Sequence, residues 1–489
     1  MGKIQSIIIF CKKPGFILSL ILVVFFLKGL FLATLSPMFS GQDESRHYNT
    51  IQFLAEPKEK NWEIIKIKVK NREKERLETY NFSEEIKKTI VAAQLNIERQ
   101  GNYSKALFSG GYNGKNEAEI NSDQWDPYNK EYPPDIAGKR TKAYHLAALQ
   151  IEKLFGQQSI LIRFYLIRIF SILLATAVVL ISYLVFKNSG FSKKISLAIT
   201  AIIAFQPKFS DYMSNINYDS LLILSFALFT LGAVLFLKNG FNWKNLALMS
   251  GSVVLGLLTK GPAIALLIVF LLLISFHIYQ GVRNKKISKK YILFFITLVI
   301  ALLFVFGQKY NLAQIVPWGP KDSPTEIISS ASEYLSKSIT RIPSSSTNYW
   351  GNLDWTHDNI DKYIIWIIWA AEFLAVIGLV LFFRSDKKPS WLPEKKYIIF
   401  FLIMIIVLQF GIRLADWSAF IKTGSLKLGT PGRYFLPNII AHMTVVFTGL
   451  GIILKKEKYF RNILIGGLIL MFSFSMYLIF DIIMPRFYL

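Results

Sequence analysis

The chain has 489 residues, of which 53% are hydrophobic and 15% aromatic, and its formal net charge at pH 7 is +24. A soluble protein of this size does not carry many continuous apolar runs of about 20 residues, the length that crosses about 30 Å of hydrocarbon. The strands of a membrane β-barrel would alternate in polarity, whereas these runs are continuously apolar. We therefore expect an all-α polytopic membrane protein.

The positive charge is concentrated in short connections between the apolar runs. Six of them hold 22 Lys and Arg against 3 Asp and Glu, and they are every second connection: 1–15, 187–194, 238–244, 281–290, 384–396 and 455–462. This positive-inside pattern predicts that these connections and the N-terminus face the cytoplasm. The charge therefore indicates topology, and no nucleic-acid partner is expected.

About eleven membrane spans are predicted, and they divide the chain into three parts. Residues 1–36 are the cytoplasmic N-terminus and first transmembrane helix, 37–157 the first external segment, and 158–489 the transmembrane bundle with an external loop at 308–361. The spans are expected near 16–36, 160–186, 193–209, 216–237, 244–258, 261–280, 290–307, 362–383, 397–414, 433–454 and 461–484.

The first external segment opens with Asp43-Glu44-Ser45-Arg46-His47, soon after the first apolar helix is broken at Pro37. Adjacent carboxylates at a membrane boundary are costly unless they are paired or used. The alternative is a solvated loop start with a helix cap. Asp43 and His47 also have the i, i+4 spacing of two metal ligands on a helix, but no third ligand is evident, so no metal site is predicted.

The rest of this segment predicts a small α/β elaboration. Residues 65–69 alternate as a half-buried strand does. Ser83 followed by two glutamates marks a helix start, and apolar residues at helical spacing continue to Ile97. Residues 109–140 are rich in Gly, Asn, Tyr and Pro and are expected to form a loop, whereas the stretch from Tyr144 to Phe155 is amphipathic and predicts a helix along the membrane surface.

Few ionisable residues lie in or beside the later spans, and all but one fall toward the predicted external side. They are Arg163, Arg168, Asp219, Lys260 and Arg433, with Arg168 as the exception. Each alone is more often structural, and an arginine at a span end commonly snorkels to the interface. Together with the acidic pair they indicate one cavity for an anionic ligand at the outer leaflet.

Aromatic residues mark the second external loop, where Tyr349 and Trp350 precede Gly351. An aromatic belt at the membrane interface explains them equally well. The third loop ends in a Gly/Pro cluster before Arg433 and Tyr434, which permits a tight return into the membrane. The chain has no phosphate-binding G-x-x-x-x-G-K-[ST] loop, no H-E-x-x-H and no G-x-S-x-G, so ATP hydrolysis and serine hydrolysis have no visible machinery.

The order of these motifs resembles the GT-C superfamily of membrane glycosyltransferases, which includes protein O-mannosyltransferases and lipid A aminoarabinose transferases. Within it the chain is most similar to a group of bacterial predicted membrane proteins without settled function. The likeness covers nearly the whole chain and rests on six short stretches: Asp43 to His47, Leu166 to Ser171, Gln206-Pro207 with Asn217 to Asp219, Leu258 to Lys260, Tyr349 to Gly351, and Gly432 to Tyr434. The lysine-rich insert at about 56–100 departs from the pattern.

The resemblance implies an inverting transferase that takes a sugar from a polyprenyl-phosphate donor. Asp43 would be the general base, with Glu44 and His47 orienting the base or the acceptor. Cationic groups would neutralise the donor phosphate, and aromatic and polar groups would hold the sugar. The phosphate-binding candidates are Arg433, Lys260 and Arg163, and the substrate-binding candidates are Tyr434, Asp219, Tyr349 and Trp350. Some members of the superfamily use a divalent cation and others do not, so no cofactor is assigned.

The expected acceptor is a cell-envelope glycan or wall polymer, and the expected location is the bacterial cell membrane with an extracellular active site. A polyprenyl-linked polysaccharide polymerase or ligase would share the donor, but its largest external loop is expected later in the chain. A lipid or sugar transporter would need central polar residues and repeated halves, and neither is clear in this sequence.

Overall fold

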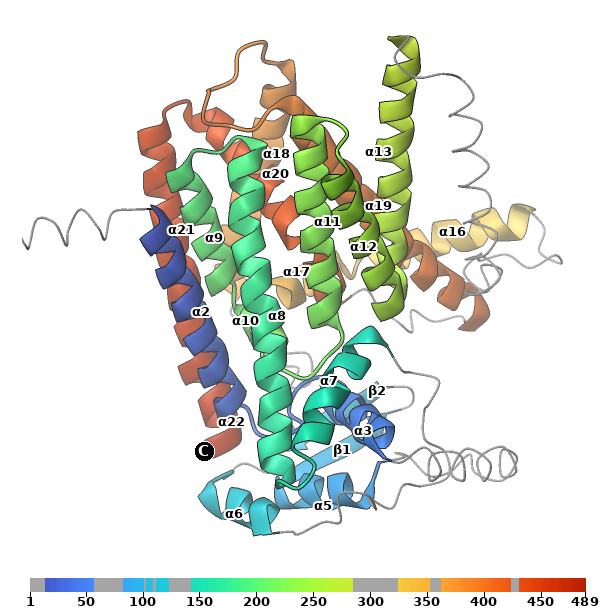
Figure 1. Ribbon diagram of the computed structural model, residues 1–489, viewed down its shortest axis with the longest axis vertical. Coiled ribbons are helices and arrows are strands. Elements are labelled where there is room, and N and C mark those ends of the chain that lie inside the picture. The colour runs from blue at the N-terminus through green and yellow to red at the C-terminus, as the bar shows by residue number, and fades with distance from the viewer. Residues whose placement is uncertain are drawn as a thin grey trace, which may run out of the picture.

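The computed structural model describes residues 14–56, 82–100, 103–108, 111–122, 142–284, 324–351, 362–423 and 431–489. It is a bundle of long helices with a group of short elements at one end (Figure 1). That group contains α3, α5, α6 and α7, and we call this end of the bundle the motif end. The C-terminus also lies there, beside the last turns of α2.

Within the described residues, eight helical stretches are long and apolar enough to cross a membrane. They are α2 (Pro14–Leu35), α8 (Ile160–Ser189), α11 (Asp219–Asn239), η2 (Gly261–Ala263) with α13 (Ile264–Arg283), α18 (Lys362–Arg384), α19 (Lys395–Thr423), η3 (Gly432–Asn438) with α20 (Ile439–Leu454), and α21 (Glu457–Tyr477) with η4 (Leu478–Ile483) and α22 (Met484–Tyr488). The prediction of a multi-pass helical membrane protein is confirmed, and each of the eight coincides with an expected span.

The predicted count of eleven spans is not confirmed. The expected spans near 193–209 and 244–258 correspond to α9 (Lys193–Phe205) and α12 (Trp243–Thr259), helices of 13 and 17 residues. A span usually needs about 20 residues, so these helices are short for a full crossing. The expected span near 290–307 lies outside the described residues. Three further helices are α10 (Pro207–Met213), α16 (Pro324–Ile339) and α17 (Ile342–Trp350).

The segment after α2 mixes helices with one hairpin. Its helices are α3 (Glu44–Ala55), α5 (Glu84–Ala92), α6 (Gly114–Ser122) and α7 (Ala143–Leu154), and the antiparallel strands β1 (Leu95–Gln100) and β2 (Tyr103–Phe108) pair from Leu95 opposite Phe108 to Gln100 opposite Tyr103. The helix expected from 144 to 155 is present as α7, whereas its position along the membrane surface stays a prediction. The strand expected at 65–69 lies outside the described residues.

Two predictions in this segment were wrong. The helix that begins at Ser83 does use this residue as its cap, since Ser83 Oγ accepts a hydrogen bond from the N–H of Ile86 at 3.2 Å. It ends at Ala92, however, because Gln94 adopts a left-handed conformation with φ of 55° and turns the chain back into β1. Ile97 therefore belongs to a strand. Part of the expected loop at 109–140 forms α6.

Close helix contacts in the bundle depend on small residues. At the crossing of α18 and α20, a Cβ on Gly378 would lie 1.9 Å from the carbonyl oxygen of Gly449, and one on Gly449 would lie 2.0 Å from that of Ala375. Glycine is needed at both positions because the two backbones touch. This is how helices approach closely in membranes, where hydrophobic attraction between helices is weak.

Candidate functional site

The acidic pair begins α3 at the motif end. Asp43 precedes the helix in the left-handed region, with φ of 56°, a conformation that Asp tolerates better than most residues. Its side chain is 43% exposed and lies 3.5 Å from the guanidinium of Arg46. The neighbouring Glu44 side chain is fully buried. Of the two adjacent carboxylates, Asp43 thus reaches the surface and Glu44 lies in the core.

Glu44 forms a buried, two-pronged ion pair with Arg168 of α8. Its Oε1 lies 2.8 Å from Nε of Arg168, and its Oε2 lies 2.7 Å from Nη2. The same carboxylate accepts hydrogen bonds from the N–H groups of Ile216, at 2.9 Å, and Gly41, at 3.1 Å. Such fork-to-carboxylate pairs combine charge with fixed geometry. Glu44 therefore ties the start of α3 to α8 and to the loop before α11.

The remaining donors of Arg168 satisfy the end of α2. Nη1 donates to the carbonyl oxygens of Ala33 and Ser36, each at 2.6 Å, and Nη2 donates to that of Pro37 at 3.0 Å. The last carbonyls of a helix have no partner within the helix, and a buried arginine is well suited to accept this role. One guanidinium thus fixes both the end of α2 and the beginning of α3, on either side of the turn that carries Asp43.

Two histidines link α3 to α7, and their hydrogen bonds determine their tautomers. Nδ1 of His145 accepts from the N–H of Lys142 at 3.1 Å, so a neutral His145 carries its proton on Nε2. That Nε2 lies 3.0 Å from Nδ1 of His47 and therefore donates to it. His47 then carries its own proton on Nε2, which makes it a hydrogen-bond donor at that atom rather than a base. Burial lowers the pKa of His145, so this arrangement persists at neutral pH.

Tyr218 connects the histidines to Lys260, which forms a cationic cluster with Arg433 around the ring of Tyr434. Its ring meets the ring of His47 edge-on at 4.5 Å between centroids, and the ammonium of Lys260 lies 4.7 Å from its centroid. Burial raises the pKa of Tyr218; the charge of Lys260 opposes this rise, and the carboxylates of Asp219 and Asp43 add to it. Tyr218 therefore contacts both the first turn of α3, which follows Asp43, and Lys260.

Lys260 and Asp219 form an ion pair at the motif end of α11 and α12. Nζ of Lys260 lies 2.8 and 2.9 Å from the two carboxylate oxygens, and the hydroxyl of Tyr212 donates to Oδ2 of Asp219 at 2.6 Å. Although burial favours the neutral amine, the Asp219 carboxylate raises the pKa of Lys260. The pair is therefore ionised. The Lys260 side chain is 19% exposed, so part of it reaches the surface of the site.

Tyr434 and Arg433 complete the cluster from η3. The Lys260 ammonium lies 4.8 Å from the centroid of Tyr434, and the Arg433 guanidinium lies 5.0 Å from it. The N–H of Arg433 donates to Oδ1 of Asn348 at 3.0 Å, which joins η3 to α17. Gly432 permits this contact, since a Cβ there would lie 2.0 Å from the carbonyl oxygen of Ser345.

The other sequence-predicted candidates lie elsewhere. Arg163 is 1% exposed and pairs with Glu85 at 2.5 Å and with Glu152, and it donates to the hydroxyl of Tyr48 at 3.2 Å. This second buried ion-pair network joins α8 to α5, α7 and α3. Carboxylates pair with both terminal nitrogens of Arg163, so we assign Arg163 a structural role and not that of a phosphate-binding residue.

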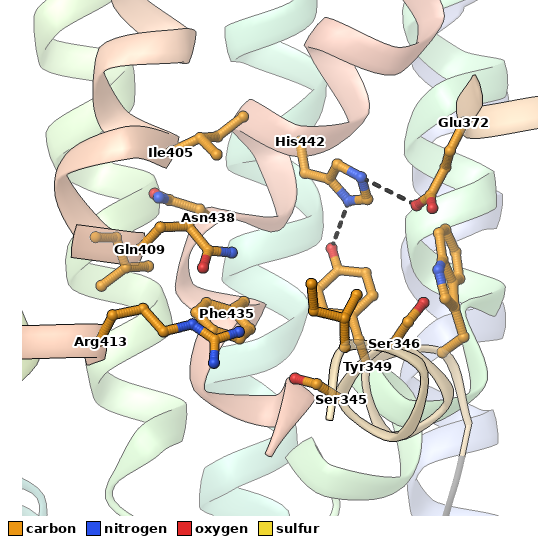
Figure 2. Close-up of a pocket in the computed structure, with 13 residues that line it drawn as sticks. Ser345, Ser346, Tyr349, Glu372, Ile405, Gln409, Arg413, Phe435, Asn438 and His442 are labelled. Carbon is orange, nitrogen blue, oxygen red and sulfur yellow. Dashed lines mark hydrogen bonds and ion pairs between the residues drawn. The ribbon is translucent and has the colours of Figure 1, made fainter. Parts of the chain in front are cut away.

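Tyr349 and Trp350 line a cavity of about 200 Å³ between α17, α18, α19, η3 and α20 (Figure 2). His442 lies between two other lining residues: its Nδ1 is 2.9 Å from the hydroxyl of Tyr349, and its Nε2 is 3.3 Å from Oε1 of Glu372. The cavity and the cationic cluster share η3, since Phe435 lines the cavity while Tyr434 contacts Lys260.

The sequence prediction missed several residues that the fold brings into these sites. His145, Tyr212 and His442 gave no local signal, because single polar residues on helices are common. Tyr218 lay within the stretch from Asn217 to Asp219 but was assigned no role. Glu372 did give one, since a carboxylate within a span is costly and usually functional. Within the described residues, no group of three His, Cys, Asp or Glu side chains could hold a metal ion.

A comparison with family models matches residues 25–442 to the predicted membrane protein family DUF2142. No curated protein matches the chain. The matched region contains the acidic pair, the cationic cluster and the Tyr349–His442 cavity. It covers most of the 489 residues. The chain therefore belongs to the DUF2142 family of predicted membrane proteins.

Proposed function

We propose that the motif end is the active site of an inverting GT-C-type glycosyltransferase, which moves a sugar from a polyprenyl-phosphate donor to a cell-envelope glycan or wall polymer. One observation carries the proposal. The half-exposed carboxylate of Asp43 immediately precedes α3, and His47 on the first turn of α3 meets the ring of Tyr218, which also contacts Lys260. This placement of the candidate base and the candidate phosphate-binding residue at one end of the bundle supports the proposal.

The reaction needs one base and one cationic surface. Asp43 takes the proton of the acceptor hydroxyl while the oxygen of that hydroxyl attacks the anomeric carbon. The bond from that carbon to the phosphate oxygen breaks, and its electron pair stays on the polyprenyl phosphate. Lys260 and Arg433 neutralise the phosphate charge. Because a polyprenyl phosphate leaves readily, no second carboxylate is needed as an acid, in contrast to glycoside hydrolysis.

The neighbours of Asp43 have supporting roles in this proposal. Glu44 is a positioning residue, because its buried pair with Arg168 holds the turn on which Asp43 lies. His47, on the first turn of α3 after Asp43, orients the base or the acceptor. Asp219 holds Lys260 in place, and Tyr434 offers a ring face between Lys260 and Arg433. No cofactor is assigned.

The experiment compares envelope glycans from wild-type cells, deletion cells and cells with Asp43→Asn, by mass spectrometry and linkage analysis. We expect one sugar substituent to be lost in both mutants at unchanged protein levels. Glu84→Gln is the matched control, since Glu84 is a surface carboxylate at the start of α5 that pairs with Lys87. A normal glycan in the Asp43→Asn cells would refute the proposal. A defect in the deletion alone would point to transport, and a loss of chain length to a polymerase.

The proposal places the motif end outside the bacterial cell membrane and the N-terminus in the cytoplasm. The single native cysteine, Cys11, makes this easy to test by thiol labelling. In intact cells a membrane-impermeant maleimide should label Lys115→Cys, whose position in α6 is exposed, when Cys11 is replaced by serine. Labelling of Lys115→Cys only after permeabilisation would reverse the orientation.

A further inference from the structure

The cavity lined by Tyr349 and Trp350 carries a constellation of polar groups that Asp43 chemistry does not use. Ten of its residues are labelled in Figure 2, where side chains from α17, α18, α19, η3 and α20 converge on one space. The polar ones are Ser345, Ser346, Tyr349, Glu372, Gln409, Arg413, Asn438 and His442. Such a concentration of hydrogen-bonding groups within a membrane bundle is costly unless a ligand uses it.

Three polar side chains form a row along one wall. Nε2 of His442 lies 3.3 Å from Oε1 of Glu372, and a carboxylate at that distance favours a proton on Nε2. With its proton there, His442 accepts at Nδ1 from the hydroxyl of Tyr349, 2.9 Å away. The side chains of Glu372 and His442 are 29% and 26% exposed, so both reach accessible surface. Once its proton is directed at His442, the Tyr349 oxygen is oriented to accept a hydrogen bond from a further hydroxyl.

A second observation points to an absent ligand. Asn438 is 95% buried and lines the cavity, and its amide nitrogen donates to the carbonyl oxygen of Met404 at 2.8 Å. Its Oδ1 has no hydrogen-bond partner among the described residues. A buried carbonyl without a donor loses the hydrogen bond that water would give it, so it destabilises the site when no ligand is bound. A ligand hydroxyl, reached by a small shift of this side chain, would satisfy it.

The size and lining of the cavity select the class of ligand. An apolar cavity of about 150 Å³ admits one six-membered ring, and this cavity measures about 200 Å³. Its lining combines aromatic faces from Trp350 and Phe435 with carboxylate, amide, guanidinium and hydroxyl groups. Aromatic faces match the C–H face of a sugar ring, and paired polar groups match its hydroxyls. A hydrocarbon tail would offer no hydrogen bond to these polar groups, and it would leave Oδ1 of Asn438 without a donor.

We propose that this cavity binds a single sugar ring, with Glu372, His442 and Tyr349 reading its hydroxyls along one wall and Arg413 on the other. The inference rests on the proposed function for the source of the sugar, which is either the donor lipid or the end of the acceptor. The proposed phosphate-binding residue Arg433 adjoins this cavity in the fold, because its N–H donates to Asn348 of α17, the helix that carries Tyr349.

The test uses the full chain in lipid nanodiscs and methyl hexosides as the probe, with saturation-transfer NMR as the readout. We expect ring protons of at least one methyl hexoside to receive saturation, and Glu372→Gln and His442→Gln each to weaken its binding about tenfold or more. Trp366→Ala is the matched control, because Trp366 lies on α18 and its side chain is 55% exposed. The absence of saturation from every hexoside, or equal affinity in wild type and both variants, would overturn the proposal.

Competition separates the sources. A short-chain prenyl-phosphoryl hexose displaces the methyl hexoside if the cavity holds the donor sugar, and leaves it bound if the cavity holds the acceptor sugar. Displacement by prenyl phosphate without a sugar, or by inorganic phosphate in a manner lost in Arg413→Gln, would identify an anion site and overturn the proposal. The Asp43→Asn variant should bind the hexoside normally, so failure of the transfer reaction and failure of this site are distinguishable.

Discussion

Glu44→Gln is the sharpest test of how the site is built. The substitution keeps the shape of the side chain but removes the charge that faces Arg168, and both side chains are fully buried. The amide that replaces one carboxylate oxygen would also direct N–H groups at a donor, since Gly41 and Ile216 both donate to this carboxylate. The change therefore leaves a buried positive charge and a clash between donors.

The expected loss is large. Removing one partner of a buried ion pair costs about 3–5 kcal/mol, because the other charge stays desolvated. A loss of 3 kcal/mol in the free energy of local opening corresponds to about 150-fold less protection of backbone amides from hydrogen exchange. The amides of α3 should show this loss, since Glu44 is the first residue of that helix. Envelope glycan transfer should fall as well, because Asp43 lies on the same turn.

Hydrogen exchange of the purified chain in nanodiscs, read by mass spectrometry, measures the effect. The double variant Glu44→Gln with Arg168→Met should recover part of the protection, because it removes the unpaired charge. The control is Glu333→Gln, which breaks an exposed pair with Lys337 and should cost less than about 0.5 kcal/mol. If Glu44→Gln abolished transfer while α3 kept wild-type protection, Glu44 would act on the substrate and its positioning role would be wrong.

Three further predictions follow from other contacts. Burial lowers the pKa of His145 below its ordinary value of 6.5, so below that pH the unfolded chain binds a proton that the folded chain does not. The free energy of opening α7, measured by hydrogen exchange, should be constant above about pH 6.5 and fall below it by up to about 1.4 kcal/mol per pH unit. The variant His145→Gln should remove this slope. Gly449→Ala places a Cβ 2.0 Å from the carbonyl oxygen of Ala375, so α18 and α20 must separate at a cost of about 1–3 kcal/mol, and an unchanged thermal midpoint would contradict this contact. Lys260→Met and Asp219→Leu should each destabilise more than the two together, and additive losses in this double-mutant cycle would show that the pair is not coupled.

The membrane-spanning part of the fold could be predicted because its signal is local. A continuous apolar run of sufficient length specifies a helix whatever its neighbours are, and eight expected spans coincide with long helices in the structure. The boundary errors arose where one residue overrides a periodic pattern. The spacing from Ile86 to Ile97 continues as a helix would, yet Gln94 adopts a left-handed conformation and ends the helix. Nothing in the apolar spacing signals that change.

The site was predictable in part, for a similar reason. Lys260, Asp219, Tyr434 and Arg433 were expected to converge from their span ends, and the structure brings them together. The partners of Arg163 were not foreseeable, because they come from α5 and α7 in a segment whose folding depends on tertiary contacts. A sequence shows that a charge is near a membrane boundary, but which opposite charge meets it depends on how the helices cross.

The acidic pair shows how one turn can place two adjacent carboxylates, Asp43 and Glu44, in different environments with different roles. A helix start buries some of its first residues against the bundle and leaves the residue before the helix at the edge. Here Asp43, in the left-handed conformation, ends the turn that precedes α3, so that Glu44 enters the core while Asp43 stays 43% exposed. The free energy needed to remove the Glu44 carboxylate from water is larger than the stabilisation that its place at a helix start provides. Arg168 and two backbone N–H groups offset it, and the same guanidinium closes the end of α2.

The rigidity of this turn is what a general base requires, because a carboxylate displaced by about 1 Å loses much of its rate advantage. An exposed Asp43 on a flexible loop would have the same chemistry but not the same geometry, and Arg168→Gln should therefore impair transfer even though Arg168 contacts no substrate.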